Sequence, residues 1–374
     1  MNFTHTDERQ MLADMAGRFV REQYPIEKRH ENAATDDGFS RDLWAQMAEL
    51  GLVGALFSED VGGFGGAGFD IATIFEEVGR GLVVEPFLSN LLAGTALASG
   101  GDSIGGIIEE IMAGSKLAAF AHGEPASRYT LSHVETTAQK EGDVYILNGA
   151  KAVVLNGDTA DVIVVSVRIS GDTTDENGIS LFAVPGDADG LMRRGYPTID
   201  GYRAAELRLD GVKVGADALI GGEGAAFENI QQVTATGILA VSAEALGAID
   251  AAIEMTLDYL KTRKQFGVVI GQFQALQHRM ADMMMEREQI RSAVINMAGH
   301  LADEERDWHA SATKNLIGRS GRRIAEEAIQ MHGGIGMTWE YAIGHFAKRI
   351  IMIDHMFGDV DHHLEQISKM RRAA

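Results

Sequence analysis

The feature that most limits the fold of this chain is its hydrophobic period, which changes twice along the sequence. Residues 1–115 and 224–374 place apolar side chains at helical spacing, as in "RQMLADMAGRFV". Residues 116–223 are divided into short β-branched segments, such as "ADVIVVSVRI", which glycine, asparagine and aspartate turns separate. The sequence therefore predicts an α+β fold with three domains: an N-terminal α-helical domain (1–115), a β-domain (116–223) and a C-terminal helical bundle (224–374).

Local signals indicate the elements inside each domain. In the first domain, Ser40 is expected to cap a helix that ends at Gly51. In the second, six or more short strands at close spacing, from about residue 116 to 217, predict an antiparallel sandwich or barrel. In the third, long apolar helices with few prolines predict an antiparallel four-helix bundle.

Charge and cysteine content exclude several classes of function. The chain has 33 Lys+Arg against 54 Asp+Glu, a formal net charge of −21, which repels nucleic acids and anionic membranes. It contains no cysteine, so disulfides, thiolate nucleophiles and cysteine-ligated metals are excluded. The N-terminus lacks the pattern of a signal peptide, and no uncharged apolar stretch reaches membrane-spanning length. We therefore expect a cytoplasmic protein with neither nucleic-acid nor membrane partners.

Two glycine-containing turns between predicted helices have the chemistry to bind a diphosphate. The first reads "RKQFG" and offers the guanidinium of Arg263, with Phe266 able to lie against an aromatic ring. The second reads "QMHGGIG", in which Gly333, Gly334 and Gly336 permit close backbone approach and leave amides free to donate. Taken singly, each turn is also compatible with an ordinary helical connection whose polar residues are incidental.

Together, the two turns closely resemble those of the acyl-CoA dehydrogenase family. The resemblance covers essentially the whole chain and includes "EDVGGFGG", the "EP" at Glu124–Pro125, "LNGAK" and "LIGGEGAAF". It implies a helix–barrel–helix fold, FAD as cofactor and α,β-dehydrogenation of an acyl-CoA thioester. In this family a carboxylate takes the α-proton while the flavin N5 takes the β-hydride. An electron-transfer flavoprotein is the acceptor that the resemblance implies.

The resemblance also implies which residues hold FAD across a subunit interface. In the family, an R-x-x-F-G turn and a Q-x-x-G-G-x-G turn of one subunit bind the adenosine–diphosphate arm. Gln274 is a looser match near the adenine end. The implied cofactor-binding residues are Arg263, Gln265, Phe266, Gly267, Gln274, Gln330, Gly333, Gly334 and Gly336.

The segments that contact the flavin ring in the family depart from its pattern here. Where the family has W-I-T-N-G, this chain reads "VVLNG", so that Val153 and Leu155 replace the Trp and the Thr. Where the family has T-E-P-x-A-G-S-D, this chain reads "GEPASRYT", with Gly123, Arg128 and Tyr129 at changed positions. The usual Y-E-G-T aligns with "FGDV", which puts Gly358 at the position of the catalytic Glu. The second base position known in the family falls on Gly237, and a glycine cannot abstract a proton.

The stretch "MIDHMFGDVDHH" that contains this position has three interpretations. His355, Asp359 and His362 or His363 have spacings compatible with a metal site, although the family uses no metal. Asp359, one residue after the expected Glu, is an alternative base. The third interpretation is that the base has been lost. The ending also resembles the small subunit of pimeloyl-CoA dehydrogenase, and heteromeric bacterial members of the family share one flavin between two unlike chains.

Three functional hypotheses follow. The first is a subunit without a catalytic base that supplies the arm-binding turns to a paralogous partner bearing that base, so no catalytic residue is assigned to this chain. The second is a self-sufficient homo-oligomeric dehydrogenase that uses Asp359 as its base. The third is a non-redox binding or scaffold protein of the same fold.

Overall fold

The computed structural model describes residues 6–100 and 102–373, which form two compact units. A helical unit comprises the chain up to Glu31, Ala67–Val83 and the chain from Ile238 onwards. A sheet unit comprises Asn32–Gly66 and Val84–Gly237. The sequence boundaries at residues 115 and 223 stay predictions, because these units follow contacts in space rather than sequence order.

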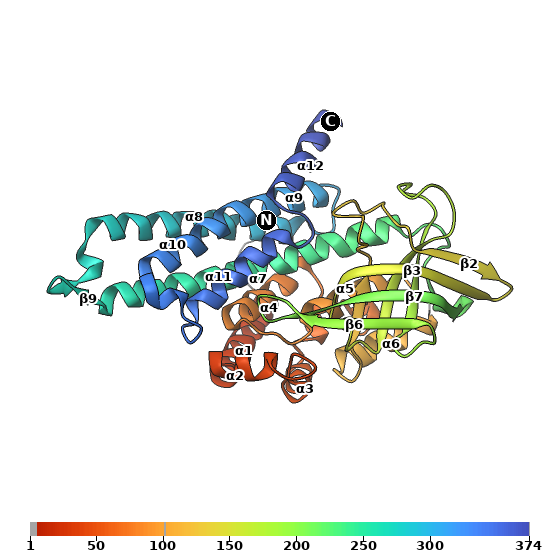
Figure 1. Cartoon of the computed structure of the whole chain (residues 1–374), viewed down its shortest axis with the longest axis horizontal. Helices are drawn as coiled ribbons and strands as arrows, with labels where there is room; N and C mark the ends of the chain where they lie inside the picture. The colour runs from red at the N-terminus through yellow and green to blue at the C-terminus, as the bar shows by residue number, and fades with distance from the viewer. Residues whose placement is uncertain (1–5, 101, 374) are drawn as a thin grey trace. The chain divides into compact units, whose positions relative to one another are not determined.

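The helical unit contains the long C-terminal helices (Figure 1). Thr6 caps its first helix by accepting the Arg9 amide at 3.3 Å. Two antiparallel helices, α7 and α8, are joined by a hairpin of β9 (Lys264–Gln265) and β10 (Val268–Val269), which follows the C-terminus of α7. The helices of this unit are α1 (Asp7–Gln23), α2 (Ile26–Ala33), α4 (Gly68–Gly81), α7 (Phe227–Thr262), α8 (Gln274–His300), α9 (Arg306–Leu316), the π-helical turn η5 (Ile317–Gly321), α10 (Arg322–His332), α11 (Ile343–His355) and α12 (Val360–Ala373).

Helix α4 packs on α7 with backbone against backbone. A Cβ atom added to Gly79 would lie 1.9 Å from the Glu244 carbonyl oxygen, and one added to Gly247 would lie 1.8 Å from that of Glu76. Any larger residue at either position would push the two helices apart. By length and composition, an 18-residue stretch of α7 could cross a membrane, but 89% of it is buried inside the protein. Its apolar sequence is therefore that of a core helix.

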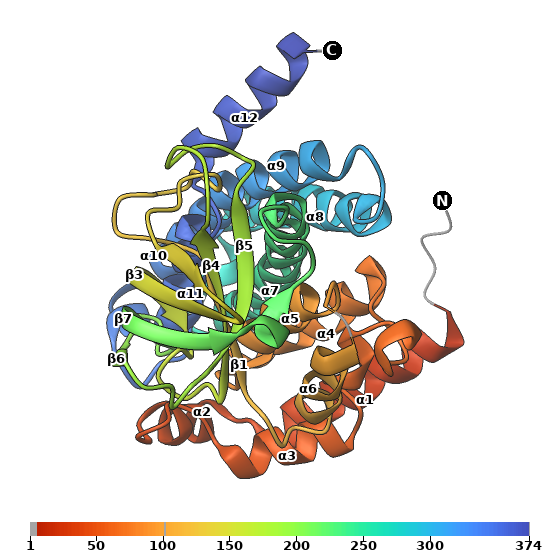
Figure 2. The ribbon, with the colours of Figure 1, turned by 90° about the vertical axis from the view of Figure 1, so that its right-hand side faces the viewer.

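The sheet unit is built on one mixed sheet (Figure 2). Its strand order is β6-β7-β3-β2-β4-β5-β8, with β1 paired to β4. The strands are β1 (Ala118–Ala121), β2 (Thr137–Glu141), β3 (Val144–Leu155), β4 (Val162–Arg168), β5 (Ile179–Pro185), β6 (Leu191–Pro197), β7 (Arg203–Gly215) and β8 (Leu219–Ile220).

Most strand pairs are antiparallel, as predicted, but β1 runs parallel to β4 from Ala118↔Val162 to Ala121↔Val165. Only strands joined by a tight hairpin must be antiparallel, and β2 and β3 lie between β1 and β4 in the sequence. The spacing of the strand-like segments therefore could not fix the direction of β1.

Helices α3 (Arg41–Glu49), α5 (Phe87–Leu97) and α6 (Asp102–Met112) complete the sheet unit. The predicted limits of α3 are confirmed: the Ser40 hydroxyl accepts the Leu43 amide at 3.3 Å, and Gly51 has φ +81° after the helix. Short 3₁₀ turns are η1 (Gly54–Leu56), η2 (Glu59–Val61), η3 (Ala216–Ala218), η4 (Ile270–Gln272) and η6 (Gly333–Met337).

Candidate functional site

The β9–β10 hairpin presents an aromatic side chain to solvent at a cost in backbone energy. Its two turn residues, Phe266 and Gly267, have φ +53° and +82°, the pattern of a type I′ turn. A residue with a side chain is disfavoured in this left-handed region, and the Phe266 side chain is 92% exposed. Strain of this kind, kept where no burial compensates it, is typical of functional positions.

Arg263 stands at the base of this hairpin, directly after the end of α7. Its carbonyl oxygen accepts the Ile270 amide at 2.9 Å, which closes the hairpin. Its side chain is exposed. Within residues 6–100 and 102–373, no carboxylate pairs with the Arg263 guanidinium. The N–H groups of a guanidinium that is fixed at its backbone and has no carboxylate partner are available to donate to a phosphate group.

The second predicted turn, at Gly333 and Gly334, is open to solvent. Helix α10 ends at His332, and Gly333 follows with φ +67°. A Cβ atom added to Gly333 or to Gly334 would meet nothing within 4 Å. Gly336 differs, because it is buried and its Cβ atom would lie 3.1 Å from that of His332. Gly333 and Gly334 thus expose backbone to an approaching group, while Gly336 serves packing.

Ring packing brings the two turns to the same end of the helical unit. The rings of Tyr259 and His332 lie 4.6 Å apart between centroids. Tyr259 lies one helical turn before Arg263, whose amide donates to the Tyr259 carbonyl at 2.8 Å. His332 directly precedes Gly333, and burial lowers its pKa, so it packs as a neutral ring. Sequence reasoning missed this Tyr–His contact.

The remaining cofactor residues of the prediction lie around these turns. Gln265 lies in β9, Gln274 begins α8 and Gln330 lies in the last turn of α10. All three side chains are exposed. Apart from the buried Gly336, the predicted arm-binding residues therefore lie on the accessible surface of one unit.

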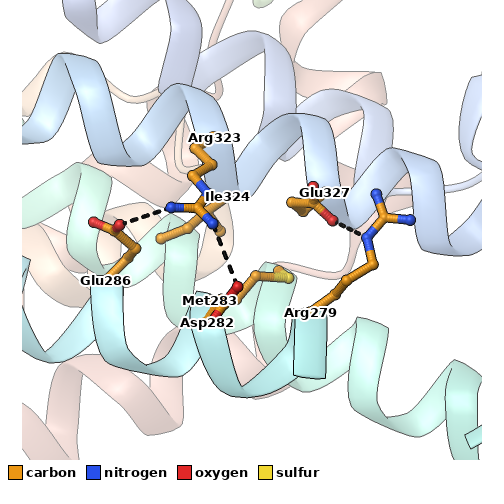
Figure 3. A pocket seen from close by; sticks show the side chains of 7 residues that line it. All are labelled: Arg279, Asp282, Met283, Glu286, Arg323, Ile324 and Glu327. Carbon is orange, nitrogen blue, oxygen red and sulfur yellow. Dashed lines mark hydrogen bonds and ion pairs between the residues drawn. The ribbon is translucent and has the colours of Figure 1, made fainter. Parts of the chain in front are cut away.

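Ion pairs between α8 and α10 hold the helices that carry these residues (Figure 3). Arg323 reaches from α10 to Asp282 at 3.4 Å and to Glu286 at 3.2 Å. Arg279 pairs with Glu327 in the reverse direction. Because each of these charged groups has a protein partner, the pocket they line works as a clamp between helices rather than as a ligand site.

The position of the expected base, Gly358, has no room for a side chain. Its φ is +118°, and an added Cβ atom would lie 2.6 Å from both His362 Cδ2 and His363 Nε2. Its carbonyl oxygen accepts a hydrogen bond at 2.8 Å from Nζ of Lys314, which is fully buried. Burial lowers the pKa of Lys314 to about 8.

Asp359 caps α12. Its carboxylate accepts the His362 amide at 2.9 Å, and its carbonyl accepts the His363 amide at 3.1 Å. His363 is buried and its Nε2 donates to the Phe357 carbonyl at 3.1 Å, whereas His355 is exposed. Among the residues that the structure describes, this stretch does not gather three such groups with all ligand atoms within 4.8 Å of one another.

In the sheet unit, the segment expected near a flavin ring is strained. Val153 has φ +54° beside a register shift between β3 and β7, and its side chain is 61% exposed. A β-branched residue in this conformation is a genuine outlier. Two residues earlier in β3, Lys151 Nζ lies 2.7 Å from Glu124 Oε1, with both side chains buried. This ion pair makes the "EP" and "LNGAK" segments parts of one structural core.

Three sequence models of acyl-CoA dehydrogenase domains match the chain. The N-terminal domain matches residues 6–103, the middle domain 119–212 and the C-terminal domain 227–370. The chain belongs to the acyl-CoA dehydrogenase family. It is 31% identical to the probable acyl-CoA dehydrogenase YngJ of Bacillus subtilis, over 92% of either chain.

Two solved structures share the fold of this acyl-CoA dehydrogenase family member. Butyryl-CoA dehydrogenase from Megasphaera elsdenii has a TM-score of 0.91 at 25% identity and covers 99% of this chain and 100% of its own. A variant of the Tcur3481-Tcur3483 steroid ACAD has a TM-score of 0.88 at 26% identity and covers 98% of each. The predicted helical, β-sheet and helical domains of the family are thereby confirmed.

FAD is the cofactor of this family, and the residues present fit one half of it. Exposed Phe266, the accessible guanidinium of Arg263 and the open glycines Gly333 and Gly334 suit the adenosine–diphosphate arm. On the ring side, Val153 offers no aromatic surface, and Leu155 offers no hydroxyl.

Proposed function

We propose that this chain is the subunit of a heteromeric acyl-CoA dehydrogenase that lacks the catalytic base. It supplies the arm-binding turns to an FAD whose ring, base and acyl pocket belong to a paralogous chain. The observation that carries the proposal is the contrast between the open turns at Gly333 and Gly334 and the closed position at Gly358.

At position 358, the backbone conformation and the neighbouring side chains also oppose a catalytic Glu. A Glu at position 358 would need both a left-handed backbone and the displacement of His362 and His363. The second base position, Gly237, is buried within α7. A corner packed around a glycine supports a chain that takes no part in proton abstraction.

The role of Asp359 supports the same assignment. Its carboxylate is engaged with the first turn of α12, which accounts for an acidic residue at this position without a catalytic task. In the proposed complex the partner's carboxylate takes the α-proton of the acyl-CoA. Bound FAD supplies the hydride acceptor, and an electron-transfer flavoprotein reoxidises it. We place the complex in the cytoplasm, in the catabolism of fatty acids or other lipids.

A relative also supports a heteromer. The steroid ACAD named above carries a paired designation, Tcur3481-Tcur3483, and its chain is similar to this one along 98% of its length. By analogy, the proposed assembly is a heterotetramer of two unlike chains.

The test is the flavin content per chain, measured together with the native mass, for this protein alone and co-expressed with a paralogue that retains Y-E-G-T. We expect little flavin in the chain alone and one flavin per unlike pair in the complex. One flavin per chain in the isolated protein, with turnover, would overturn the proposal in favour of the self-sufficient enzyme. No flavin in any complex would leave the non-redox scaffold.

A further inference from the structure

Two histidines and two carboxylates meet where α8 turns into α9, far along the sequence from the flavin motifs. His300 is the last residue of α8, Asp303 and Glu305 lie in the connection, and His309 lies in the first turns of α9. The two imidazole rings stack with centroids 4.0 Å apart and planes inclined by 13°. None of the predicted cofactor-binding or base positions is among these residues.

The potential ligand atoms of this cluster have the separations of a metal site. His300 Nδ1 lies 3.8 Å from Glu305 Oε2, and His309 Nε2 lies 3.7 Å from the same carboxylate. Tetrahedral ligands on bonds of about 2.0 Å are roughly 3.3 Å apart. Because a histidine binds a metal ion in the plane of its ring, the two stacked imidazoles must also turn relative to each other. Asp303 Oδ2, at 2.7 Å from His300 Nδ1, is placed to become a fourth ligand.

A side chain of α8 holds the ring of His309 in a fixed orientation. Its Nδ1 lies 3.2 Å from the side-chain amide of Asn296, one α8 turn before His300. The atom that faces Nδ1 is the amide nitrogen Nδ2, a donor, so the ring proton lies on Nε2 and must leave that atom before a metal ion binds there.

A second group in the sheet unit, Glu124 with His133 and Glu135, has similar spacing but is already committed. Glu124 accepts the Lys151 ammonium at 2.7 Å and the Thr136 and Glu135 amides at 3.0 and 2.6 Å. In the cluster at the α8–α9 turn, by contrast, the Glu305 side chain is 72% exposed and can follow a ligand.

We propose that His300, Asp303, Glu305 and His309 bind one divalent transition-metal ion, which pins the end of α8 to the start of α9. Two imidazoles with carboxylates favour Zn²⁺, Ni²⁺ or Co²⁺ over the oxygen-seeking Mg²⁺ and Ca²⁺. Both helices are already folded against each other, so the site is structural, and water can complete the coordination on its exposed side.

The test is a titration of the full-length, untagged chain with Co²⁺ and Zn²⁺ after treatment with a chelator. We expect one ion per chain, visible d–d absorption of bound Co²⁺ and a rise in melting temperature with Zn²⁺. His300→Gln and His309→Gln should weaken binding by at least about 10- to 100-fold. The matched control is His278→Gln, an exposed histidine of α8 outside the cluster, which should bind as the wild type does.

A second variant guards against loss of folding at the buried His309. Glu305→Gln changes an exposed side chain, so its melting temperature without metal should equal that of the wild type while Zn²⁺ affinity falls by at least about tenfold. The proposal is overturned if the wild type binds no Zn²⁺ or Co²⁺. It is equally overturned if His300→Gln and Glu305→Gln both bind with unchanged affinity.

Discussion

At the tip of the β9–β10 hairpin, Phe266 occupies a conformation in which asparagine is far more at ease. Phe266→Asn would create the Asn-Gly pair preferred in type I′ turns, and we expect it to raise the free energy of unfolding by up to about 1–2 kcal/mol. The same change removes the exposed ring, so flavin retention in the co-expressed complex should fall. Thermal melting of the chain and flavin content after gel filtration measure the two effects. A variant that gains stability and keeps all its flavin would show that the ring does not touch the cofactor.

At Asp359, two replacements can distinguish a helix-capping role from a catalytic role. Asparagine caps helices as well as aspartate does, so Asp359→Asn should be nearly neutral for stability, whereas Asp359→Ala should lose about 1 kcal/mol. Denaturant unfolding of both variants checks this order. Turnover by the complex should survive both changes; an inactive Asp359→Asn complex would instead identify this residue as the base.

At the scale of elements, the corner between α11 and α12 buries His363 next to Lys314. Burial, followed by the Lys314 and His362 charges, lowers the pKa of His363 from 6.5 to about 3. Between these values the unfolded chain binds a proton that the folded chain does not. The ring therefore lowers stability as the pH falls from 6.5 toward 3, by up to about 1.4 kcal/mol per pH unit. His363→Gln should make the plot of unfolding free energy against pH shallower in this window.

The same elements show what the sequence could and could not predict. The turn at Phe266–Gly267 and the cap at Ser40 depend on residues a few positions apart, so local motifs identified them, although the two short strands that flank the turn were not predicted. The contact of Tyr259 with His332 and the backbone crossing at Gly247 join residues far apart in the chain, where no local pattern records them. The match of "FGDV" to Y-E-G-T locates Gly358, but the ring atoms of His362 and His363 that close its space depend on how α12 packs, which no local pattern records.

For the whole molecule, the two sets of predicted flavin-contacting positions differ in how well they match the family pattern. The arm-binding turns keep their motif residues, their exposure and the ion-pair clamp between α8 and α10. The ring-side positions Val153, Leu155 and Gly358 carry none of the aromatic, hydroxyl and carboxylate groups of the family pattern. The proposed assignment of the chemistry to a partner chain would account for both observations.

This division predicts that Arg263 matters to the complex and not to the isolated chain. Arg263→Ala removes a charge-assisted contact to phosphate worth about 1.5–3 kcal/mol, so FAD should bind the co-expressed pair roughly 10- to 150-fold more weakly. Because its guanidinium pairs with no carboxylate in the described chain, the melting temperature of the chain alone should not change. Fluorescence titration of the flavin-stripped complex measures the affinity, and Lys261→Ala, an exposed cation one half-turn earlier, is the control. Unchanged affinity in Arg263→Ala would place the diphosphate elsewhere and remove the basis for assigning the arm to this chain.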